Sequence, residues 1–227
     1  MRKWILIGMV AGLFASLAVM SIGARFGIVA VDLQRPDTHW FWYLSRAAGI
    51  SAYLALALSV VWGLLLSTGL ADTWIARGRS VDLHKWTSAV ALALVLTHAF
   101  VLVGDPYVRF DLVAVVVPFA AEYRRLAVAL GVLSAYGTVV VFGSFWLRRQ
   151  IGQRTWRVVH VLAFPTFGLV TLHGILAGSD SGTPWMRLVY LLGGGVVLWL
   201  VTYRLVTQST PLRPEHAHGP NRQLRTE

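Results

Sequence analysis

Long runs of apolar residues alternate along the chain with short polar segments. Six runs are long enough to cross a bilayer, at about residues 4–23, 43–67, 84–103, 126–147, 157–177 and 186–206. Each run must be helical, because a backbone surrounded by lipid has to satisfy its own hydrogen bonds. The pattern therefore predicts an all-α integral membrane protein, a bundle of six helices.

The first run has some features of a signal peptide, with Arg2 and Lys3 before it and Ser-Ile-Gly-Ala before Arg25. Its apolar stretch is longer than a typical signal-peptide core, so we expect a retained helix. The predicted organisation is a first helix and outer loop at 1–40, a helical membrane domain at 41–206, and a disordered cytoplasmic tail at 207–227.

Lysine and arginine predict the orientation. With the N-terminus inside, 13 of the 20 Lys and Arg residues fall on the inner side, as the positive-inside rule requires. Both termini are then cytoplasmic, in a multi-pass protein of the inner (plasma) membrane. The runs at 84–103 and 157–177 both cross from inside to outside.

Composition supports the membrane class and narrows the chemistry. The chain is 56% hydrophobic and 13% charged, which leaves too few charges to cover a soluble domain. It has no cysteine, which excludes disulfides, thiolate metal sites and cysteine-held iron–sulfur clusters. The net charge of +10 comes from basic residues beside the apolar runs, so we expect lipid headgroups as partners and no nucleic acid.

Four histidines lie in two of the predicted helices. His84 and His98 are 14 residues apart, and His160 and His173 are 13 apart, so each pair spans about 20 Å along a helix. Because the two helices run in the same direction, His84 should meet His160 near the inner face (the inner pair). His98 should meet His173 nearer the outer face (the outer pair).

Two stacked imidazole pairs form the axial ligand set for two b-type hemes, whose iron would be held by all four histidines. Zinc fits less well, because zinc ligands gather at one point. A spacing of 13 residues turns His160 and His173 in different directions on an ideal helix. Pro165 lies between them, and we expect that helix to be irregular between Phe164 and Gly168.

Heme propionates need cationic partners, which arginine supplies well. The candidates are Arg79 and Arg157 for the inner heme, together with Lys85, and Arg46 for the outer heme. Membrane topology and snorkelling explain the same residues. Trp156 could pack on a porphyrin or belong to the interfacial belt. Several glycines, Gly49, Gly63, Gly131, Gly137 and Gly143, could leave room for a macrocycle or allow close helix contact.

The chain resembles the ferric reductase-like transmembrane domain family over roughly residues 40–206. The motifs that carry the resemblance are Ser45-Arg-Ala-Ala-Gly49, Asp82-Leu-His-Lys-Trp86, Thr97-His98, the stretch from Gly152 to His160, and His173-Gly174. The family includes the membrane parts of ferric reductases and NADPH oxidases, and the heme-binding membrane subunit of bacterial methionine sulfoxide reductase. The resemblance implies transmembrane electron transfer through heme.

Two differences from the family leave alternatives open. A soluble flavin and nicotinamide domain usually follows the last helix, but only about 20 residues follow here. We therefore expect a component of a membrane oxidoreductase, with no catalytic residue of its own, a separate flavoprotein or quinol donor, and an outer-face acceptor: ferric iron, a periplasmic reductase or a quinone. The sulfoxide reductase subunit resembles this chain in size, in its six helices and in the stretch running into His160, so a one-heme subunit that also binds FMN is an alternative. That subunit often lacks a histidine where this chain has His84, which is a difference between the two. A heme-free, proton-coupled carrier is another.

Overall fold

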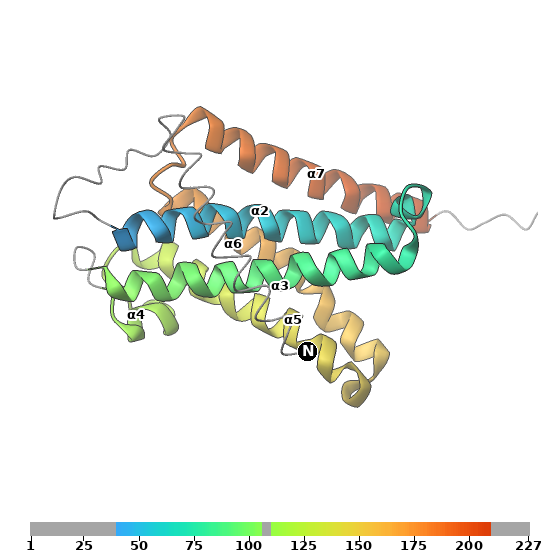
Figure 1. Cartoon of the computed structure of the whole chain (residues 1–227), viewed down its shortest axis with the longest axis horizontal. Coiled ribbons are helices and arrows are strands. Elements are labelled where there is room, and N and C mark those ends of the chain that lie inside the picture. The colour runs from blue at the N-terminus through green and yellow to red at the C-terminus, as the bar shows by residue number, and fades with distance from the viewer. Residues whose placement is uncertain (1–39, 106–109, 210–227) are drawn as a thin grey trace, which may run out of the picture.

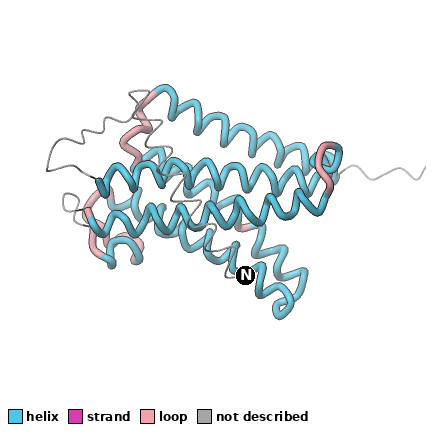
Figure 2. Tube along the Cα trace, viewed as in Figure 1, coloured by secondary structure: helices cyan, strands magenta, loops and turns pink. Residues whose placement is uncertain are grey.

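A computed structural model describes residues 40–105 and 110–209, and no strand occurs within these ranges. Five long helices make up most of this part of the chain (Figure 1). They are α2 (Trp40–Thr68), α3 (Arg77–Val101), α5 (Arg125–Val161), α6 (Ala163–Ala177) and α7 (Pro184–Ser209). Short loops join them (Figure 2), with the 3₁₀ turns η1 (Leu70–Thr73) and η2 (Leu102–Gly104) and the short helix α4 (Leu112–Val116). The predicted first span and the tail from residue 210 lie outside the described residues.

Four stretches of the described chain are long and apolar enough to cross a membrane: Trp40–Thr68, Arg77–Gly104, Arg125–Ala177 and Pro184–Thr207. The third has 53 residues and folds back on itself, because Ala127 near its start contacts His173 near its end. Its two limbs correspond to the predicted spans 126–147 and 157–177. The described residues thus fit a multi-pass membrane protein.

The reversal within α5 occurs at Gly152, where φ is 80° and ψ is 158°. This backbone conformation is available almost only to glycine, because a Cβ would clash with the neighbouring peptide groups. Helix α5 runs out to a bend, and the chain then doubles back so that α6 lies beside the first part of α5 (Figure 1). Gly152 therefore sets the antiparallel arrangement of the two limbs.

Replacing Gly152 with alanine should destabilise the protein by roughly 1–3 kcal/mol, the cost of holding a non-glycine residue in such a conformation. No atom lies within 4 Å of a Cβ added at this position, so the effect would come from the backbone alone. A thermal unfolding midpoint in detergent measures it. Gly168→Ala is the control, because position 168 also has open space and has no positive φ. An equal midpoint for the two variants would contradict this assignment.

The second limb is interrupted at Leu162, between α5 and α6. Pro165 explains the interruption, because it has no N–H to donate to the carbonyl of Val161 and its ring crowds that carbonyl. The Leu162 amide instead donates to Val159, 3.1 Å away, in a tighter turn. The irregularity predicted between Phe164 and Gly168 thus lies two residues earlier, because a proline disturbs the turn that precedes it.

Helix α2 lies between α3 and α7 (Figure 1). Its side chains Tyr53 and Leu64 form a buried cluster with Phe167 of α6 and Leu200 of α7. Large apolar side chains elsewhere point outward, such as Leu191, which is 72% exposed. A soluble protein rarely exposes so much apolar surface, whereas contact with lipid tails makes it favourable.

Candidate functional site

The structure brings together the two histidine pairs that the sequence predicts. His84 of α3 faces His160 at the end of α5, and their ring centroids are 6.1 Å apart. His98 of α3 faces His173 of α6, also at a centroid distance of 6.1 Å. The interruption at Leu162 separates His160 from His173 and allows both rings to face α3 despite their spacing of 13 residues.

The distance within each pair matches two ligands on opposite sides of one metal. A metal–imidazole bond is about 2 Å long, so two rings bound in line have centroids about 6 Å apart. Direct edge-to-face packing of two rings gives similar distances. The partners of the ring nitrogens therefore decide between these interpretations.

In three of the four histidines Nδ1 lies beside a backbone carbonyl of a neighbouring helix. The distances are 3.1 Å from His84 to Ser59, 2.8 Å from His98 to Ser45 and 2.7 Å from His173 to Ala127. A carbonyl can only accept a hydrogen bond, so Nδ1 carries the proton in each case. The neutral ring then presents an unprotonated Nε2, which is the tautomer of a metal-binding histidine with a carbonyl in its second shell.

The same three rings lie against helix glycines. A Cβ added at Gly49 would lie 2.9 Å from Nδ1 of His98, and one at Gly63 would lie 3.1 Å from Cε1 of His84. At Gly131 it would lie 2.7 Å from both Nδ1 and Cε1 of His173.

Each of these glycines follows the accepting carbonyl by four residues, as Ser45 precedes Gly49, Ser59 precedes Gly63, and Ala127 precedes Gly131. In a helix the side chain at one position shields the carbonyl four residues before it, and glycine leaves that carbonyl uncovered. We call each such arrangement a glycine seat: a histidine ring against a helix glycine, with Nδ1 donating to the carbonyl four residues earlier. From the sequence, these glycines are expected only to allow helix contact or to leave room for a macrocycle. One pattern in the sequence could have indicated their role. Gly49 and Gly63 are 14 residues apart, the same spacing as between His84 and His98.

His160 differs from the other three histidines. Its Nδ1 is buried and has no hydrogen-bond partner within the described ranges. Its ring instead stacks on Trp156, with centroids 5.0 Å apart and an interplanar angle of 27°. The inner pair therefore contains one seated histidine and one that contacts an indole ring.

A cavity of about 290 Å³ surrounds the outer pair. Its walls are largely apolar, and Arg46 and Asp180 line it together with His98 and His173. The Arg46 guanidinium donates to both carboxylate oxygens of Asp180. The guanidinium carbon also lies 4.2 Å from the centroid of the Trp42 ring. Arg46 thus lines the cavity around the outer pair, and its carboxylate partner lies 134 residues away in sequence.

The basic residues predicted for the inner heme are not joined to the inner pair in the described part of the chain. Arg79 and Arg157 are exposed and make no hydrogen bond, ion pair or ring contact that joins them to the inner pair in the described part of the chain. Lys85 pairs with Asp82 at 3.2 Å.

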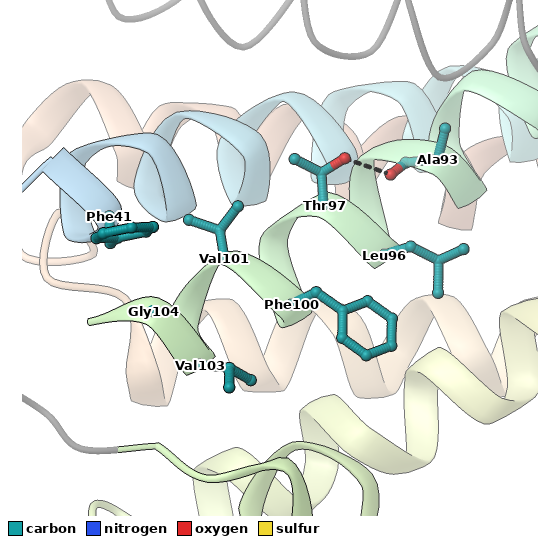
Figure 3. A pocket seen from close by; sticks show the side chains of 8 residues that line it. All are labelled: Phe41, Ala93, Leu96, Thr97, Phe100, Val101, Val103 and Gly104. Carbon is teal, nitrogen blue, oxygen red and sulfur yellow. Dashed lines mark hydrogen bonds between the residues drawn. The ribbon is translucent and has the colours of Figure 1, made fainter. Parts of the chain in front are cut away.

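A second cavity, of about 580 Å³, lies on the side of α3 near the start of α2 (Figure 3). Its lining consists of Phe41, Ala93, Leu96, Thr97, Phe100, Val101, Val103 and Gly104. No titratable side chain is among them, and the Thr97 hydroxyl donates to the Ala93 carbonyl at 2.9 Å. The histidine pairs, not this groove, therefore carry the candidate chemistry.

No group of three or more His, Asp or Glu side chains suited to a metal ion occurs among residues 40–105 and 110–209. Two imidazoles alone are too few for a structural zinc, which takes four ligands. They suit a metal whose other ligands come from a macrocycle. Comparison with family models, curated proteins and solved structures gives no match, so the site is interpreted from its own geometry.

Proposed function

We propose that this protein carries electrons across the inner (plasma) membrane through two b-type hemes, within a six-helix bundle of the ferric reductase-like kind. His84 and His160 would bind the inner heme, and His98 and His173 the outer heme. The observation that carries the proposal is the matched geometry of the pairs, two rings 6.1 Å apart in each.

The tautomers support iron ligation over a proton relay. A histidine that passes a proton along a chain of polar groups takes it at one ring nitrogen and releases it at the other, so it needs a proton-exchanging neighbour at each. Here a carbonyl fixes the proton on Nδ1 of three rings. Their remaining nitrogen presents a lone pair, which an axial ligand requires.

The residues of the chain have distinct tasks in this proposal. The histidines hold the cofactor, and the carbonyls of Ser45, Ser59 and Ala127 orient the rings and strengthen their basicity. The apolar walls around the outer pair exclude water. Arg46 lines the outer cavity, and the N–H donors that it does not use for Asp180 would stabilise propionate charge. Heme held by these residues would supply one-electron redox chemistry.

The separation of the two pairs gives the transfer a direction across the bilayer. Fourteen residues of α3 place His84 and His98 about 20 Å apart along the helix, a large part of a hydrocarbon core of about 30 Å. With both termini in the cytoplasm, a separate flavoprotein or quinol would reduce the inner heme. His98 and His173 would hold the heme nearest the outer-face acceptor, which would be ferric iron, a periplasmic reductase or a quinone.

Heme and flavin stoichiometry tests the proposal. Protein purified in detergent from heme-replete cells should contain two hemes per chain by the pyridine hemochrome assay. Its dithionite-reduced minus oxidised spectrum should be that of six-coordinate b hemes, and no flavin should be released on denaturation. One heme with one FMN would favour the sulfoxide reductase subunit instead. Monodisperse, folded protein without heme would overturn the proposal and favour a proton-coupled carrier.

A further inference from the structure

We propose that Trp156 is the positioning residue of the inner pair, holding His160 by ring stacking where glycine seats hold the other three histidines. The inference rests on the proposed function and adds a residue and a role to it. It follows from the one histidine whose surroundings break the pattern of the other three.

The stacking geometry explains how an indole can replace a seat. Trp156 lies one turn before His160 on the same helix, so the two side chains share a helix face. Their planes are 27° from parallel and their centroids are 5.0 Å apart, close to an offset stack. Because a flat contact resists rotation of the imidazole about its Cβ–Cγ bond, it fixes the ring plane without any hydrogen bond to Nδ1.

Burial separates Trp156 from the interfacial tryptophans of the chain. A belt tryptophan keeps its indole N–H near water or headgroups, and Trp74, for example, is 77% exposed. Nε1 of Trp156 is buried and has no hydrogen-bond partner within the described ranges. The indole of Trp156 therefore packs on His160 and does not present its N–H at the surface.

The surroundings of Nδ1 in the four histidines also distinguish the inner heme from the outer heme. His160 lacks the carbonyl that makes a ligating imidazole a stronger electron donor. The inner pair then has one carbonyl-polarised ligand, and the outer pair has two. The inner heme should therefore have a ferric electron paramagnetic resonance (EPR) spectrum of its own, distinct from that of the outer heme.

The test uses Trp156→Leu and Trp156→Phe in the full chain, with Trp86→Leu as the matched control. Trp86 lies two residues after His84 in sequence and is 39% exposed. Heme content and low-spin ferric EPR signals are recorded, and the inner signal is assigned as the one that His84→Ala removes. Trp156→Leu should shift or abolish the inner signal and leave the outer one unchanged. Trp156→Phe, which keeps a stacking ring, and Trp86→Leu should retain both signals.

Three results would overturn the inference. The first is an unchanged inner signal in Trp156→Leu, and the second is a change in that variant confined to the outer signal. The third is a loss of the inner signal in Trp156→Phe that is as complete as the loss in Trp156→Leu. If Trp156→Leu fails to fold, a normal inner signal in Trp156→Phe supports the role of the ring, and a lost one contradicts it. Failure of the proposed function itself would show differently, as wild-type protein without two hemes.

Discussion

Replacing His98 with alanine is expected to reduce the heme content from two per chain to one. An iron that loses one of two axial imidazoles loses its six-coordinate spectrum, and a porphyrin held by a single bond is easily lost during purification. The outer signal should disappear while the inner one remains. Heme per chain and the reduced minus oxidised spectrum measure the result.

Combinations of histidine variants make this prediction sharper. His98 and His173 belong to one pair, so the double variant His98→Ala/His173→Ala should also retain one heme. His84 and His98 belong to different pairs, so replacing both should remove both hemes. Residues that act as one unit are non-additive in this way, and residues in separate units are additive.

His39→Ala is the control, because His39 is outside the predicted ligand set. It should retain both hemes. Full heme content in His84→Ala would show that the inner pair is not a heme site. Two hemes in His84→Ala/His98→Ala would contradict the assignment of all four ligands.

The helices and the histidine pairing could be predicted from sequence because a bilayer imposes them. Apolar length alone located α2, α3 and α7, since lipid permits few other structures. Direction of crossing then determined which histidine meets which, and the structure places His84 with His160 and His98 with His173. These inferences needed only one helix at a time, or the order of helices along the chain.

Features that depend on the register between helices could not be predicted in the same way. The carbonyl that a histidine reaches depends on the axial offset between two packed helices, such as α3 and α2. No pattern within one helix gives that offset. The pairing of Arg46 with Asp180 joins residues 134 positions apart, beyond any local pattern. The stacking of Trp156 on His160 is local, at a spacing of four, but tryptophan near a span end is usually interfacial.

Gly131→Ala is the variant with the largest expected effect outside the histidines. The added Cβ would lie 2.7 Å from both Nδ1 and Cε1 of His173, closer than carbon atoms approach in folded proteins. The ring would have to move away from α5, and its hydrogen bond to the Ala127 carbonyl, now 2.7 Å, would break. Loss of such a second-shell partner typically costs about 10–100-fold in metal affinity. We expect the outer heme to be depleted or five-coordinate, with the inner heme unchanged.

Helix propensity makes the sign of this result informative. Alanine in a helix interior is more stable than glycine by about 1 kcal/mol, so Gly131→Ala would stabilise α5 if the seat had no role. Gly143→Ala on the same helix is the control, because no atom lies within 4 Å of a Cβ added there. It should keep both hemes and unfold at an equal or higher temperature. If Gly131→Ala also kept both hemes and unfolded at an equal or higher temperature, the His173 ring would not need a glycine at position 131. The proposed role of this glycine seat in iron binding would then be wrong.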